Sequence, residues 1–111
     1  MRDNRERLED IIEAINRIEK YATKGKKEFQ NNELIQNWFI SNLQIIGEAV
    51  NKLDYELKEN NPDIPFKEII GMRNILVHGY FDIDLNIVWN VIENELTPFK
   101  NKIIELIKTQ P

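Results

Sequence analysis

Apolar residues recur at intervals of three and four along almost the whole chain, which is the spacing of amphipathic α-helices. No stretch alternates apolar and polar residues as a half-buried strand would, and no segment is repeated. The 111 residues are enough for one compact domain. The sequence therefore predicts a single all-α domain over residues 1–111.

The first half of the chain predicts two helices separated by a lysine-rich segment. The first should run from about Asp3 to Tyr21 and end before Gly25, where the surrounding lysines indicate a solvated loop. The second should be a long helix from Glu33 to Lys58, with Asn31 or Asn32 as its N-cap.

The second half predicts two more helices. Pro65 is placed to open the third, which should end near His78 because Gly79 suits a left-handed C-terminal position. Asp84 is a candidate N-cap for the fourth, and Thr97-Pro98 should interrupt it by a kink or by starting a separate helix. We therefore expect an antiparallel bundle of four main helices, the last one broken at Thr97-Pro98.

The apolar surface of these helices exceeds what a small bundle can bury, so a two-fold homodimer is expected.

The chain has no cysteine and one histidine, which predicts neither a disulfide nor a metal site, and no cofactor is indicated. The first ten residues lack the apolar core of a signal peptide, and no apolar run could span a membrane, so a cytoplasmic location without membrane attachment is expected. A net charge of −4 argues against a protein that coats nucleic acid.

One segment carries candidate chemistry, because Arg73-Asn74 is followed by three aliphatic residues and then by His78. On a straight helix the Arg73 and His78 side chains would point about 140° apart, but a helix end that unwinds at Gly79 would let the imidazole swing toward Arg73. Histidine is the usual acid–base group near neutral pH, and arginine matches the geometry of phosphate oxygens. Metal-free RNA cleavage needs a base, an acid and a cation, and one histidine cannot easily be base and acid at once. A homodimer would supply two histidines and two arginines. The spacing alone is weak evidence, and by itself it favours a surface ion pair for Arg73 and a helix cap for His78.

The surroundings make the segment more specific. RNILVHGYF, with LQIIGEAVNKL and IPFKEIIGM before it, resembles the HEPN superfamily, and more narrowly the HepT-like toxins that are encoded beside a minimal nucleotidyltransferase. The resemblance extends from the first helix to about Leu106. Arg73 and His78 match the ribonuclease motif of that family, and His78-Gly79-Tyr80 matches its His-x-Tyr extension.

The resemblance implies a helical homodimer in which Arg73 and His78 cleave RNA, rather than DNA, at the dimer cleft without a metal. It also implies a cognate nucleotidyltransferase antitoxin that transfers AMP from ATP to Tyr80. Asn74 would position Arg73 or the phosphate. Glu48, a polar residue within an apolar helix stripe, would pair with Arg73 or orient His78, unless it simply faces solvent.

Two other functions remain open at this point. The domain could be a catalytically idle nucleotide- or protein-binding partner of the nucleotidyltransferase, which the acidic net charge favours. It could also be a purely structural helical dimer, which would leave the Arg73, His78 and Tyr80 grouping unexplained.

Overall fold

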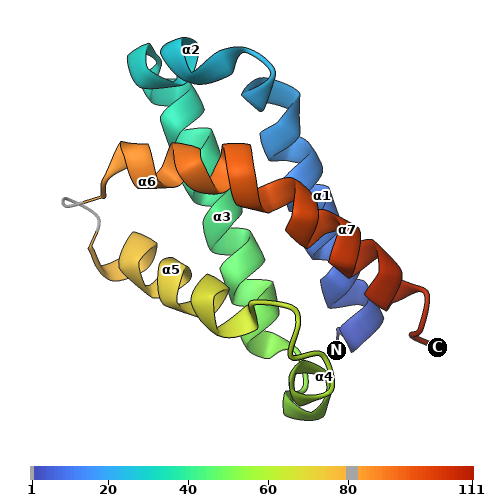
Figure 1. Ribbon diagram of the computed structural model, residues 1–111. Helices are drawn as coiled ribbons and strands as arrows, with labels where there is room; N and C mark the ends of the chain where they lie inside the picture. Colours follow the sequence, from blue (N-terminus) through green and yellow to red (C-terminus); the bar gives the residue numbers. More distant parts are fainter. Residues whose placement is uncertain (1, 80–82) are drawn as a thin grey trace.

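The computed structural model describes residues 2–79 and 83–111, with His78 described by its backbone alone. Every regular element in this part is helical, so the predicted all-α class is confirmed (Figure 1). The elements are α1 (Asn4–Ala22), α2 (Gly25–Asn31), α3 (Glu33–Lys52), α4 (Tyr55–Glu59), α5 (Phe66–His78), α6 (Leu85–Asn90), the π-helical turn η2 (Val91–Glu95) and α7 (Leu96–Ile107). None of these helices is long and apolar enough to cross a lipid bilayer.

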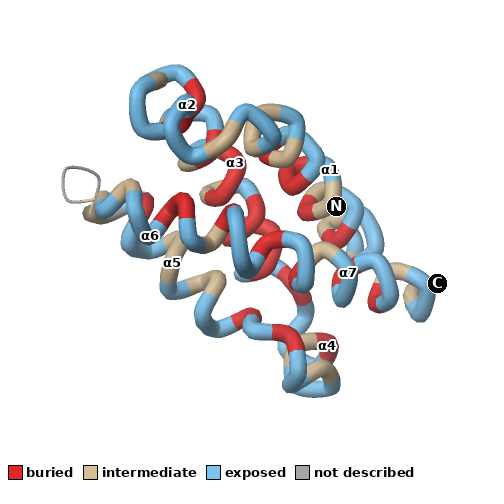
Figure 2. Tube along the Cα trace, turned by 45° about the horizontal axis from the view of Figure 1, so that its top comes forward, coloured by how far each residue is buried: buried red, intermediate tan, exposed pale blue. Residues whose placement is uncertain are grey.

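Helix α3 is the centre of the bundle. It packs against α1 and against α5, while the α6–η2–α7 segment crosses the bundle and contacts both α1 and α3 (Figure 1). The buried residues line the inward sides of these helices (Figure 2). The side chains with no solvent exposure come from α1, α3 and α7, and they are Leu8, Ile11, Ile15, Ile18, Phe39, Leu43, Val50 and Ile103.

Side-chain caps begin three helices, as the sequence predicts for two of them. Asn32 Oδ1 accepts hydrogen bonds from the amides of Leu34 and Ile35, so Asn32 rather than Asn31 caps α3. Asp84 Oδ1 accepts from the amide of Asn86 at the start of α6. Asp3 caps α1 in the same way.

The lysine-rich segment is not the loop that the sequence predicts. Gly25 adopts a φ of +88°, which turns the chain at the end of α1, and the short helix α2 follows. The lysines are exposed, as expected, but Phe29 is buried. It stacks on Phe39 of α3 and packs at a tilt against Trp89 of α6, each at 5.4 Å between ring centroids. The buried Phe29 thus packs this segment onto the bundle.

The long second helix predicted to reach Lys58 ends at Lys52 instead. Leu53 is extended, with ψ at 148°, and α4 begins after it. The break is stabilised by distant partners, because Asn4 Nδ2 donates to Asp54 Oδ2 at 3.0 Å and Asn4 Oδ1 accepts from the Asp54 amide. Lys58 Nζ also donates to the carbonyl of Val50 in the last turn of α3.

Two predictions about the second half need correction. The fourth helix is not broken at Thr97-Pro98, because both residues lie inside α7, and the irregularity is η2, one turn earlier. Pro98 has no N–H to donate to the carbonyl four residues before it, and the wider π turn lies there. Helix α5 does end at His78, but Gly79 has a φ of −102°, outside the left-handed region. A Cβ at Gly79 would instead lie 2.9 Å from the Ile75 carbonyl oxygen.

Candidate active site

Arg73 lies in the middle of α5, where this helix crosses α3. Its side chain passes directly over Gly47, since a Cβ added at Gly47 would lie 2.2 Å from the Arg73 Cβ and 2.6 Å from its Cγ. Only a residue without a side chain allows the two helices to approach so closely. The glycine of the Gly-Glu-Ala sequence in α3 therefore sets the position of Arg73.

The next residue of α3 binds the guanidinium group. Arg73 Nη2 donates to Glu48 Oε2 at 2.7 Å, and Lys52 Nζ lies 3.1 Å from the other carboxylate oxygen. Arg73 Nη1 donates to Asn74 Oδ1 at 3.2 Å. These contacts use two of the five N–H donors of the guanidinium, whose side chain is 26% exposed, so donors remain for a phosphate.

Glu48 is therefore not a simple solvent-facing acid, although its side chain is 41% exposed. The hydrogen bond from Lys52 lowers the pKa of Glu48 below its ordinary value; partial burial acts in the opposite direction, and the charge of Arg73 acts with Lys52. Glu48 is thus ionised at neutral pH. One carboxylate between two cations leaves this cluster with a net positive charge.

The end of α5 is held by a residue that the sequence analysis did not identify. Gln44 Nε2 donates to the Leu76 carbonyl at 3.2 Å, one of the carbonyls in the last turn of the helix. Gln44 lies one helical turn before Glu48 on α3, so the same face of α3 contacts both Arg73 and the last turn of α5. Its spacing from Glu48 was the available signal, but it becomes meaningful only when α3 is known to cross α5.

His78 is the last residue of α5, at the end of the helix that carries Arg73. The expected swing of its imidazole toward Arg73 falls outside the described part of the structure. Tyr80 lies outside the described residues as well. The structure therefore brings together Arg73, Asn74 and Glu48 among the predicted site residues.

Arg73 also lines a groove of about 490 Å³ between α1, α3 and α5. Lys52 and Glu48 border it, together with Arg7 and Arg17 of α1. Within residues 2–79 and 83–111, no three acidic, histidine or cysteine side chains gather as metal ligands would. The chemistry that this arrangement offers is the binding of an anion by fixed cations.

Comparisons with known proteins agree with the motif. The family described as ribonuclease HepT-like matches residues 11–106. The chain is 38% identical over 108 residues to a Methanocaldococcus jannaschii protein that is provisionally named as an RNase. The match covers 96% of this chain and 93% of that protein. It is 33% identical over 108 residues to a protein named "Probable ribonuclease HepT" of Thermococcus cleftensis, covering 96% and 98%.

A shorter match links the chain to a protein named "mRNA nuclease HepT" of Shewanella oneidensis, 39% identical over 44 residues, which covers 40% of this chain and 32% of that protein. No solved structure matches significantly. The family match covers most of the chain, including Glu48, Arg73 and His78. The chain is thus a member of the ribonuclease HepT-like family, as the motif predicted.

Proposed function

We propose that this protein is the endoribonuclease toxin of a toxin–antitoxin pair and cleaves RNA without a metal ion. Membership of a ribonuclease family, and relatives that are named as ribonucleases, support the activity. The observation that carries the proposal is the Arg73 guanidinium, which Glu48 holds at 2.7 Å with further donors left free, on the helix that ends at His78.

In the proposed reaction the ribose 2′-oxygen attacks the neighbouring phosphorus, and the bond from phosphorus to the 5′-oxygen breaks. A base takes the 2′-hydroxyl proton, an acid gives a proton to the leaving 5′-oxygen, and the product is a 2′,3′-cyclic phosphate. Arg73 stabilises the negative charge that develops on the phosphate oxygens, with Asn74 helping to position it. His78 transfers protons. Because this chain has one histidine, base and acid come from two copies of it.

The apolar groove between α5 and α6 is the proposed docking surface for the second copy. Ile75 and Ile87 border this groove of about 590 Å³ and are 64% and 61% exposed. Such large apolar side chains gathered around one groove indicate a protein contact. A copy docked here would lie next to the last turn of α5, which carries His78. Docking of a second copy in this groove would form the active site that the two copies share.

RNA cleavage in EDTA is the test. The unchanged protein should leave 2′,3′-cyclic phosphate ends, and His78→Ala and Arg73→Ala should each lower the rate by about 10²–10⁴-fold. Arg5→Ala is the control, because Arg5 pairs with Glu9 on α1 and does not border the groove of Arg73. Circular dichroism should show that all variants fold. A requirement for a divalent metal, or cleavage that survives both substitutions, would refute the mechanism.

We also propose that a cognate minimal nucleotidyltransferase neutralises the toxin by transferring AMP from ATP to the Tyr80 hydroxyl, with release of pyrophosphate. The phosphate of the added AMP would then compete with RNA for Arg73. Tyr80→Phe should keep ribonuclease activity and escape neutralisation. Intact-mass spectrometry after incubation with the partner and ATP should show one added AMP on the unchanged chain, and modification of the variant would exclude Tyr80 as the acceptor.

A catalytically idle partner of the nucleotidyltransferase is the second candidate. The net charge of −4 favours it, because ribonucleic acid binding normally needs a basic surface. The cleavage assay in EDTA separates the two functions, since an idle partner would bind the nucleotidyltransferase and leave RNA intact.

A further inference from the structure

The groove that contains Arg73 differs in charge from the rest of the molecule. Four cationic and three acidic side chains line it, although the whole chain carries a net charge of −4. Each of the acids already has a cationic partner. Asp10 binds Arg2 at 2.5 Å, Glu13 binds Arg17 at 2.7 Å, and Glu48 binds both Arg73 and Lys52.

Arg7 is the cation of this groove without an acidic partner among the described residues. Its side chain makes no ion pair and no hydrogen bond with them, yet the residue is half-buried. An arginine that borders a groove and has no acidic partner there keeps its N–H donors for a ligand, and the fork of the guanidinium matches an anion such as phosphate. Arg7 therefore offers an anion site in the same groove as Arg73.

Lys52 connects Arg7 to the candidate active site. Arg7 and Lys52 both border this groove, Arg7 from α1 and Lys52 from α3. Lys52 lies one helical turn beyond Glu48, about 6 Å along α3. Lys52 and Arg73 contact the same Glu48 carboxylate, so a phosphate bound at Lys52 would lie beside a phosphate bound at Arg73.

We propose that Arg7 and Lys52 bind a phosphate of the RNA strand that flanks the phosphate held by Arg73. The substrate strand then runs from the motif on α5 into the groove between α1 and α3. This inference rests on the proposed function and extends it, since it assigns an RNA-binding role to α1. It also explains how an acidic protein binds RNA: the acids of the groove are neutralised internally, and the unpaired cation faces the strand.

The test uses a short single-stranded 2′-O-methyl RNA, which cannot be cleaved because it has no 2′-hydroxyl. Fluorescence anisotropy should be measured over a range of salt concentrations. Each phosphate contact to a single strand contributes about −0.7 to the slope of log K against log salt, so Arg7→Gln should make the slope shallower by about 0.7. Affinity at low salt should fall roughly tenfold. Arg7→Lys should keep most of the slope, because it keeps the charge.

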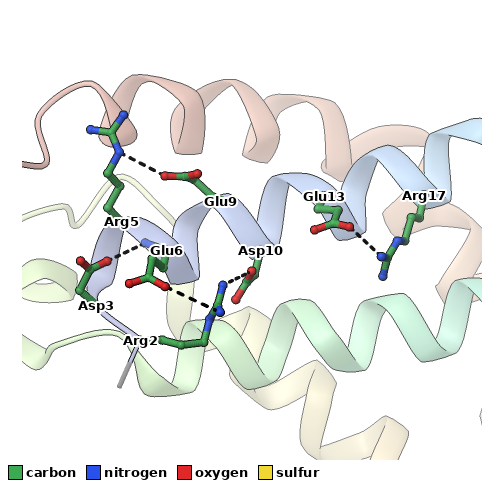
Figure 3. A network of polar contacts seen from close by, with 8 residues as sticks. All are labelled: Arg2, Asp3, Arg5, Glu6, Glu9, Asp10, Glu13 and Arg17. Carbon is green, nitrogen blue, oxygen red and sulfur yellow. Dashed lines mark hydrogen bonds and ion pairs between the residues drawn. The ribbon is translucent and has the colours of Figure 1, made fainter.

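Arg5→Gln is the matched control, with the same change of charge on the same helix. Arg5 is bound to Glu9 at 3.1 Å, and Figure 3 shows this pair on the side of α1 away from Arg2, Asp10 and Arg17. Its slope should equal that of the unchanged protein. With cleavable RNA, Arg7→Gln should raise KM more than it lowers kcat.

Three results would overturn the inference: equal slopes for Arg7→Gln and Arg5→Gln, no binding of the probe by the unchanged protein, or conversion of a dimer to a monomer by Arg7→Gln. The last result would make the groove an interface between copies. If the unchanged protein binds the probe through Arg7 but does not cleave RNA in EDTA, the proposed function fails and the binding groove stands.

Discussion

Replacing Gly47 by alanine should destabilise the protein, although alanine favours helices. The new Cβ would lie 2.2 Å from the Arg73 Cβ and 2.6 Å from its Cγ. Carbon atoms in contact are normally about 3.5–4.0 Å apart, so α3 and α5 must separate by more than 1 Å at this point. Rotating the Arg73 side chain cannot relieve the clash, because its Cβ is fixed by the backbone of α5.

The magnitude follows from two opposing effects. Overpacking of a close contact costs about 1–3 kcal/mol. The change from glycine to alanine in a helix returns up to about 1 kcal/mol. Gly71→Ala is the matched control, since a Cβ at Gly71 in α5 would meet nothing within 4 Å. That variant should gain about 0.5–1 kcal/mol. Because the helix preference cancels, the difference between the two variants measures the clash, at about 1–3 kcal/mol.

Urea unfolding followed by circular dichroism would measure both free energies of unfolding. Gly71 borders the proposed docking groove, so the measurement should be repeated over a range of protein concentrations to separate folding from association. Gly47→Ala should also lower RNA cleavage, since it displaces Arg73 from Glu48. A Gly47→Ala variant as stable as Gly71→Ala would refute the close approach of α3 and α5.

Three further predictions concern the same surfaces. The pKa of Glu48 should be below that of an ordinary glutamate, so the stability from its ion pairs is present above the unfolded-state pKa and is lost as the pH falls through the lower folded-state pKa. NMR of the carboxyl carbon would measure the pKa of Glu48, and Lys52→Gln should raise this pKa. Glu48→Gln should reduce cleavage by loosening Arg73, whereas Glu105→Gln, which removes an exposed pair with Lys108, should not. The proposed dimer should become a monomer in light scattering when Ile75 is replaced by Asp, and it should persist when Leu34, which is 81% exposed on α3, is replaced by Asp. A dimeric Ile75→Asp variant would exclude the proposed docking surface.

Local signals in the sequence were sufficient for most of the helices. Helical spacing and the caps at Asn32 and Asp84 depend on residues that are neighbours in the chain. The errors arose where a distant contact decided the backbone. The break after Lys52 depends on Asn4 contacting Asp54, fifty residues away, and α2 depends on Phe29 reaching Phe39 and Trp89.

The sequence by itself determined the all-α class, the family and the identity of the candidate residues Arg73 and His78, because short motifs and helical periodicity are written in consecutive residues. Only the tertiary structure decided what surrounds Arg73. The crossing of α3 and α5 over Gly47 places Glu48 at 2.7 Å from the guanidinium, and the packing of α1 on α3 brings Arg7 into the same groove. These residues are far apart in the chain, and their contacts depend on how the helices pack, which no local pattern specifies.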